Sequence, residues 1–391
     1  MEKINAYEFI DETLGQEGGR FVFNECPNPL LVELNQQASS LISSLCHYAH
    51  SEHYTKKPRD VLFEFVASDD FRLFSFVTPQ NAEPPVDCFC ITATVYPSLL
   101  DIFGRMLSHP QVFPDLGKAS HEEVERSYFP TLRRSIVRHG VCVPITKTRR
   151  IFAATLAELA LEILVFHELS HLAVGHIDFK NFISGRNSPH TSGSLEGQNV
   201  TYHALEMDAD CRSVLLTLNR LLRRMHSVER VPLVRNVPPD HEILCAEAAA
   251  LYACANRERA VKTLIFVIYV LFRMHFKGVW DPENPTKEQH QDMVLRQTWV
   301  KATLWEIFNT RPEYQYDPMK FAREDAEVTH YAEVACGKIL ATEPNFDYLL
   351  STIKPEVKNK HETYMFNVKE EWSRIRPFLE SYKRVSETLP P

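Results

Sequence analysis

The pattern of hydrophobic positions divides the chain into a short β-rich part and a long helical part. Between residues 59 and 96, three aromatic and β-branched runs, VLFEFV, FRLFSFV and CFCITATVY, are separated by ASDD and TPQNAEPP. Short runs of this composition, bounded by turn-forming residues, predict β-strands. Three strands joined by such turns predict a small antiparallel sheet.

Helical periodicity flanks this sheet and dominates the rest of the chain. Residues 35–47 have a helical pattern, and Pro97 opens another helix at the position where proline is favoured. From Ile151, the run IFAATLAELALEILVFHELSHLAV is apolar around most of a helix, and Gly175 offers its stop. Further helices are predicted at residues 200–225, 241–254 and 260–276. Another is predicted at 286–308, where it opens with the capping-box pattern TKEQ, and one begins at Pro318 with Asp317 as its cap.

These patterns predict the α+β class, with a small antiparallel sheet followed by a mostly helical body. The sequence contains no Pro/Gly/Ser-rich linker, low-complexity tract or internal repeat that would separate independent domains. We therefore expect one compact unit with three parts. Residues 1–150 form an N-terminal part with the sheet and flanking helices, residues 151–310 form a helical core with the candidate site, and residues 311–391 form a C-terminal helical extension.

Charge argues against a polyanionic partner. Forty-three Lys and Arg residues against fifty-one Asp and Glu residues give a net charge of −8, and such a field does not favour nucleic acid or an anionic membrane surface. One basic stretch, NRLLRRMHSVERVPLVR at residues 219–235, has leucines at helical spacing. We interpret its arginines as the solvated face of a helix and predict no nucleic-acid partner.

Three features bear on the compartment. The acidic N-terminus MEKINAYEFIDETLGQEGG lacks the pattern of a secretory signal, and the most apolar run, residues 264–272, is too short to span a bilayer. Nine dispersed cysteines without a CxxC pair are typical of reduced thiols. Cys88 and Cys90 share one strand face, where packing is the favoured interpretation. We expect a cytoplasmic protein without a membrane partner.

The segment FHELSHLAVGH, residues 166–176, carries the candidate chemistry. His167 and His171 are four residues apart within a helical pattern, so both imidazoles can reach one metal ion. Glu168 would stand beside the metal, where a carboxylate can take a proton from zinc-bound water. The alternative is an ordinary buried helix on which these histidines are hydrogen-bonded.

A catalytic zinc keeps three protein ligands, so a third ligand is needed. The pattern HExxHxxGxxH fails, because Val174 stands at the glycine position and Ile177 at the third histidine position. His176 is one residue early, on a different side of the helix or just past its end.

The later stretch YHALEMDADCRSV supplies a carboxylate instead. Glu206 and Asp210 are four residues apart on one helix face. Glu206 can complete the site, and Asp210 can accept a hydrogen bond from the free nitrogen of a ligand histidine. The alternative is that EMDAD forms a solvated acidic face.

Together, HELSHLAVGH and EMDAD resemble the HExxH and ExxAD motifs of the gluzincin-type zinc metallopeptidases, including HtpX-like and ImmA/IrrE-like proteins. The similarity covers residues 166–211 and implies a zincin-like helical body that binds zinc. By this resemblance His167, His171 and Glu206 would be ligands, Glu168 the general base and Asp210 the outer partner of a ligand histidine.

The resemblance has limits. HtpX-like proteases carry transmembrane helices, and many ImmA-like proteins sit beside a DNA-binding helix-turn-helix; we identify neither here. The layout is also similar to the Lit family of phage-exclusion proteases, whose substrate is a host translation factor.

A peptidase of this kind needs two further parts. One is an edge strand along which an extended peptide can pair, for which residues 71–77 or 88–96 are candidates. The other is a donor for the oxyanion; HQDMVLR, residues 290–296, resembles a histidine-then-arginine element of HtpX-like enzymes. Candidate donors are Tyr202, His203, His290 and Arg296.

We therefore expect a zinc-dependent endopeptidase that cleaves an intracellular protein or peptide. The alternative is a zinc-stabilised regulatory or binding protein with latent or no proteolysis. Residues 180–199 motivate it, because a Gly- and Ser-rich mobile loop there could cover the site until a regulatory partner binds. A third possibility is a pair of buried helices without metal.

Overall fold

A computed structural model describes most of the 391-residue chain. No helix among the described residues is both long and apolar enough to cross a membrane. The described residues are 3–53, 59–79, 81–122, 141–185, 195–228, 242–274, 293–340, 342–345, 350 and 354–385.

A three-stranded sheet forms at the three predicted runs. It contains β2 (Asp60–Val66), β3 (Leu73–Val77) and β5 (Val86–Thr92), in the order β2-β5-β3. The antiparallel prediction is correct for β3 with β5 but wrong for β2, which runs parallel to β5 with Asp60 opposite Val86. The last strand enters between the first two, and every residue of β5 is buried. This central place explains why its sequence is a nearly continuous apolar run.

Helices cover both faces of this sheet. On one face α1 (Ala6–Gln16) presents Ile10 and Leu14, which pack with Cys88 and Cys90 of β5. The structure thus places both thiols in a small apolar core, as the packing interpretation expects. Beside α1, the short parallel strands β1 (Ile4–Asn5) and β4 (Ala82–Glu83) pair with each other.

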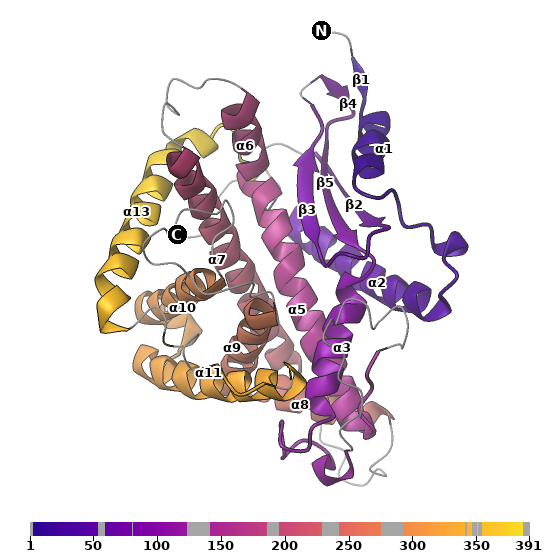
Figure 1. The fold of residues 1–391 in the computed structure, drawn as a ribbon, viewed down its shortest axis with the longest axis vertical. Coiled ribbons are helices and arrows are strands. Elements are labelled where there is room, and N and C mark those ends of the chain that lie inside the picture. Colours follow the sequence, from indigo (N-terminus) through magenta and orange to yellow (C-terminus); the bar gives the residue numbers. More distant parts are fainter. Residues whose placement is uncertain are drawn as a thin grey trace.

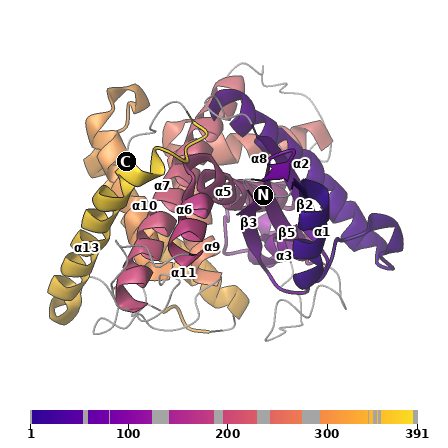
Figure 2. The same ribbon diagram turned by 90° about the horizontal axis from the view of Figure 1, so that it is seen from above.

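The opposite face of the sheet packs against helices, which include α2 (Pro29–His53) and α3 (Val95–Leu107). Helix α3 begins two residues before Pro97, the predicted start. Helix α5 (Lys147–Val174) runs through the middle of the molecule and also packs against the sheet. The sheet, α1, α2 and α3 lie on one side of α5, and on the other lie the helices of the C-terminal half, such as α7 (Leu195–Val228), α10 (Met293–Thr310) and α13 (Pro355–Leu379) (Figure 1). Viewed from above, α5 again lies between the two halves (Figure 2). A helix that is apolar around most of its circumference requires such a place.

The remaining helices build the other half of the molecule. They confirm the mostly helical body of an α+β fold, with bounds within a few residues of most predicted ones. Asp317 caps α11 as predicted, since its Oδ1 accepts the N–H of Met319 at 2.8 Å. The predicted TKEQ capping box lies outside the described residues. The helices of this half are α6 (His176–Gly185), α7 (Leu195–Val228), α8 (Glu242–Cys254), α9 (Arg257–Met274), α10 (Met293–Thr310), α11 (Pro318–Leu340) and α13 (Pro355–Leu379). Short 3-10 turns lie at Phe23–Glu25, Ala119–His121 and Pro312–Tyr314.

The predicted loop at residues 180–199 is too long. Helix α6 continues to Gly185 and α7 already begins at Leu195, so both ends of the predicted loop are helical. Phe179 and Ile183 of α6 are buried in the main core, which explains why this stretch is held as a helix despite its polar neighbours. The middle of the predicted loop, residues 186–194, lies outside the described residues.

A sharp turn at Gly175 joins α5 to α6. Its φ of 84° lies in the left-handed region, as predicted for a helix stop. A Cβ on this residue would lie 2.4 Å from Cβ of Tyr382 in the C-terminal segment. Both the conformation and the close approach therefore require glycine.

The C-terminal segment after α13 fixes α6 to the sheet. The N–H of Arg384 donates to the carbonyl of Ala173 at 2.9 Å. The buried guanidinium of Arg384 binds Asp87 of β5 at 3.0 Å and Asp178 of α6 at 2.7 Å. The Arg384–Asp87 contact joins residues 297 positions apart, and together these contacts hold α6 beside the end of α5.

Candidate metal centre

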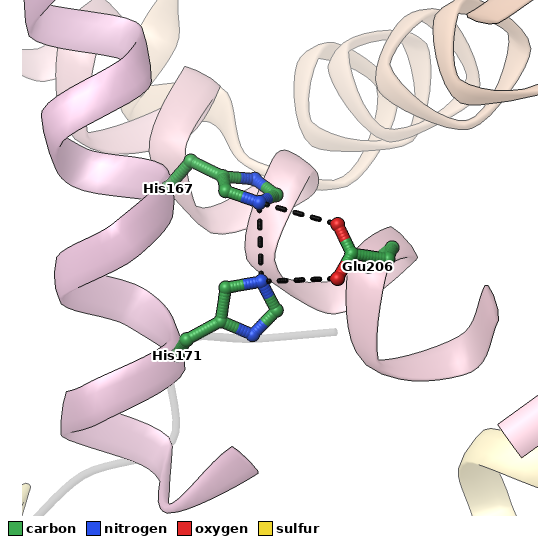
Figure 3. Close-up of side chains that lie close together, drawn as sticks. All are labelled: His167, His171 and Glu206. Carbon is green, nitrogen blue, oxygen red and sulfur yellow. Dashed lines mark hydrogen bonds and ion pairs between the residues drawn. The ribbon is translucent and has the colours of Figure 1, made fainter. Parts of the chain in front are cut away.

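The C-terminal half of α5 presents two histidines on one face. His167 and His171 are one turn apart, and their Nε2 atoms lie 3.1 Å from each other (Figure 3). The neighbouring turns of α5 are apolar and buried in the main core, so the backbone that carries these histidines is fixed by packing. The sequence spacing therefore results in two imidazole nitrogens that point to the same place.

Glu206 approaches the same place from α7. Its Oε2 lies 3.3 Å from Nε2 of His167, and its Oε1 lies 3.3 Å from Nε2 of His171 (Figure 3). The side chains of His167, His171 and Glu206 are only 11, 4 and 12% exposed. One ligand atom from each of these residues lies within 4.8 Å of the others, so the cluster can hold a metal ion.

The donor set fits zinc. Two neutral imidazoles and a carboxylate are ligands that catalytic zinc sites use, with a fourth position left for water. Ligand atoms about 2.0–2.1 Å from a tetrahedral ion are about 3.3 Å apart. The separations of 3.1 and 3.3 Å around the imidazole pair and Glu206 match that spacing.

The carboxylate of Asp210 lies beside the outer nitrogen of His167, the position that the sequence predicts for it. Oδ1 of Asp210 lies 2.8 Å from Nδ1 of His167, the ring nitrogen that faces away from Glu206. Nε and Nη2 of Arg296, on α10, each donate to Asp210 at 2.6 Å. Burial would raise the pKa of Asp210, but Arg296 outweighs it and lowers that pKa. Asp210 is therefore a charged partner of His167.

Glu168 is the buried carboxyl next to the first histidine. Burial raises its pKa, while the charge of His167 and the nearby hydroxyl of Ser75 on β3 oppose the shift. A carboxyl with a raised pKa holds a proton more readily than one in water. The sheet therefore contributes to the surroundings of the site through Ser75.

A second series of polar contacts begins at His171. Its Nδ1 lies 3.0 Å from Nδ1 of His176, which is fully buried at the start of α6. Oδ2 of Asp208 lies 3.3 Å from Nε2 of His176 and accepts a hydrogen bond from Nε of Arg212 at 2.5 Å. His176 lies just past the end of α5, one of the two predicted placements, and the left-handed turn at Gly175 brings it back beside His171. The prediction did not include this contact.

Lys180 of α6 lies at the cluster as well. Its Nζ donates to Oε1 of Glu206 at 3.1 Å and lies 5.9 Å from the ring centre of Tyr202. Burial opposes ionisation of Glu206, but Lys180 and then His171 outweigh it and hold the pKa of Glu206 well below its usual range. Glu206 is thus a carboxylate, the form that binds metal.

The four candidate oxyanion donors have different positions. Tyr202 stands beside Lys180, and its OH lies 3.2 Å from Oγ of Ser184. Arg296 binds Asp210, with Oε2 of Glu206 3.8 Å away. Nδ1 of the fully buried His203 lies 2.7 Å from the OH of Tyr364 on α13. His290 lies outside the described residues.

Sequence reasoning missed the roles of three residues around the cluster. Asp208 lies inside the quoted EMDAD motif, at a spacing that points to another side of α7 than Asp210. Lys180 falls within the predicted loop, although Phe179 and Ile183 on either side of it have helical spacing. His176 could be found only by predicting that the chain reverses at Gly175.

Comparison of the chain with protein-family models, with curated proteins and with solved structures found no match.

Proposed function

We propose that this protein is a zinc-dependent endopeptidase. The observation that carries the proposal is the convergence of two imidazole nitrogens and a carboxylate at the spacing of zinc ligands, next to a buried glutamate. His167, His171 and Glu206 are the residues that would hold the zinc ion. The resemblance of HELSH and EMDAD to gluzincin-type motifs supports the same assignment.

Glu168 is the proposed general base. Zinc, when bound, supplies a Lewis acid that lowers the pKa of water to about 7. The Glu168 carboxylate takes the proton of the attacking water and passes it to the amine nitrogen that leaves. The raised pKa of Glu168 suits this task, because a base must hold the proton until the amine accepts it.

The sheet offers a place for an extended substrate. Of the two candidate strands, β5 is central and paired on both sides, so it has no edge for a peptide. In the described sheet, β3 is an edge strand and carries Ser75 beside Glu168. An extended peptide that pairs with β3 would bring its backbone to the proposed base.

Lys180 and Tyr202 are the proposed donors to the oxyanion. Both lie on the Glu206 side of the cluster, and their side chains are partly exposed. Arg296 is less suited, because its guanidinium already binds Asp210 through two hydrogen bonds. A positioned donor of this kind stabilises the negative charge that develops on the carbonyl oxygen.

The test is Glu168→Gln, with cleavage of a mixed protein substrate and bound zinc measured on the same samples. We expect loss of cleavage by about a thousandfold or more with zinc retained, since the variant removes the base and keeps the ligands. Glu362→Gln is the control, because that side chain is 61% exposed on α13. Equal cleavage by wild type and Glu168→Gln would exclude the proposed base.

The enclosure of the cluster favours a second candidate function, a zinc-stabilised regulatory or binding protein. The ligand side chains are at most 12% exposed, and Lys180 lies against Glu206. In that case Glu168→Gln leaves the cellular function intact, whereas His171→Ala abolishes it together with zinc binding. The two variants therefore separate a catalytic role of zinc from a structural one.

A further inference from the structure

The two proposed ligand histidines are supported in different ways. Behind His167 stands the carboxylate of Asp210, whereas behind His171 stands a second imidazole, that of His176. We propose that His176, Asp208 and Arg212 form a relay that fixes the ring orientation and the protonated nitrogen of His171. The relay rests on the proposed zinc site, and His176 is a positioning residue in it, since it acts through His171.

The direction of each contact in the relay follows from one requirement. If Nε2 of His171 binds the metal, its remaining proton is on Nδ1. That Nδ1 lies 3.0 Å from Nδ1 of His176, which must then accept the hydrogen bond through its lone pair. His176 consequently carries its own proton on Nε2, the nitrogen that lies 3.3 Å from Asp208.

Charge at the far end of the relay keeps this arrangement in place. Oδ2 of Asp208 lies 3.3 Å from Nε2 of His176, a charge contact outside hydrogen-bond geometry, and Arg212 donates to the same oxygen. Arg212 and Asp208 are buried and oppositely charged, so they neutralise each other.

Packing leaves the His176 ring little freedom. The ring is fully buried, and it meets the ring of Trp372 on α13 edge to face, with centroids 6.0 Å apart. The turn at Gly175, closed by Tyr382, fixes where α6 begins. Ligand histidines are usually oriented by a carboxylate, a backbone carbonyl or water on the free nitrogen. A rigid imidazole supplies the same orientation here.

The first experiment compares zinc affinity of full-length variants by competition with a chelator. His176→Phe keeps the ring and removes the acceptor, and we expect zinc to bind about 10–100-fold more weakly. His176→Asn restores an acceptor oxygen near the position of Nδ1, and we expect affinity within about threefold of wild type. His109→Phe is the control, because this buried histidine lies near the other end of α5.

The second experiment reads the proton positions directly in the zinc-bound wild type, by ¹⁵N NMR of the histidine rings. We expect a proton on Nδ1 of His171 and on Nε2 of His176. This measurement needs no variant, so it remains decisive if His176→Phe does not fold.

Two results would overturn the relay while leaving the zinc site intact: zinc binding by His176→Phe as tight as that of wild type, or a His176 proton on Nδ1. If wild type itself binds no zinc, the relay and the proposed function both fail.

Discussion

Helix α5 carries a buried polar cluster near each end, and the two clusters differ in how donors and acceptors are matched. At the N-terminal end, the guanidinium of Arg149 is fully buried. Its Nε, Nη1 and Nη2 donate five hydrogen bonds of 2.6 to 3.2 Å to backbone carbonyls. The acceptors are Leu107, His109, Val112, Phe113 and Leu116.

At the other end acceptors predominate. The Nε2 atoms of His167 and His171 and both oxygens of Glu206 converge within 3.3 Å, and Lys180 is a donor to that carboxylate. A guanidinium has five N–H donors, so the Arg149 cluster is complete as it stands. Converging lone pairs and a carboxylate are stabilised by a cation. Arg149 thus forms a cluster that is complete without a ligand, whereas His167, His171 and Glu206 form one that could hold a metal ion.

Removal of Arg149 gives the largest expected effect. Arg149→Met leaves five carbonyls without their donor, and we expect a loss of about 5 kcal/mol in the free energy of unfolding. Denaturant unfolding measures it. Arg150→Met is the control, because Arg150 is the next residue and its side chain is exposed. We expect it to change the free energy of unfolding by no more than about 0.5 kcal/mol. A similar small loss for both variants would contradict the structural role of Arg149.

Substitution of Lys180 tests whether its ammonium group, beside Glu206, takes part in the proposed reaction. If its ammonium stabilises the oxyanion, Lys180→Met lowers kcat/KM for a cleaved substrate by about 100–1000-fold, or about 2.7–4 kcal/mol. Zinc should remain bound, because His167, His171 and Glu206 are unchanged. Lys358→Met, at a side chain that is 61% exposed on α13, serves as the control. Unchanged kcat/KM in Lys180→Met would remove Lys180 from the reaction.

Zinc should stabilise the protein through its ligands. At a free zinc concentration 100 times Kd, we expect about 2.7 kcal/mol of added stability for the metal-free wild type. Thermal unfolding with and without zinc measures this shift. Glu206→Gln removes one ligand charge and should lose most of the shift, whereas Arg150→Met should keep it. An equal shift in wild type and Glu206→Gln would place zinc elsewhere.

The pH dependence of the metal-free protein has the smallest expected effect. Burial opposes protonation of His167, but Asp210 and then Glu206 outweigh it and raise its pKa to about 9, above the value of about 6.5 for an unfolded chain. This stabilisation is complete below pH 6.5 and is lost as the pH rises towards 9. Burial lowers the pKa of His171 and His176, so their penalties act below pH 6.5.

Between pH 6.5 and 8 the free energy of unfolding should therefore fall by up to about 1.4 kcal/mol per pH unit. Chelated wild type, unfolded by denaturant at several pH values, gives the slope. His167→Phe should have a flatter slope in the same range. A wild-type slope equal to that of His167→Phe would show that this proton is absent.

The sequence predicted the parts that depend on local geometry. Spacing of four on a helix brings His167 and His171 together, and the same rule aligns Glu206 with Asp210 on α7. The three strands also form where short apolar runs stand between turns. These features need only helical and strand periodicity, so a single sequence contains them.

Features that depend on tertiary placement were missed or wrong. Strand order was one of them, because nothing local reveals that β5 enters between β2 and β3. The carbonyl acceptors of Arg149 come from a segment about 40 residues earlier. His176 reaches His171 only because Gly175 adopts a left-handed conformation against Tyr382. Each of these contacts is set by how distant segments pack.

The most direct test of the account is the zinc content of the purified full-length protein after dialysis against metal-free buffer. We predict one zinc ion per chain in wild type and less than about one tenth of that in a His171→Ala and Glu206→Gln double variant that remains folded. Wild type without zinc after reconstitution, or a double variant that keeps one equivalent, would contradict the proposed metal centre.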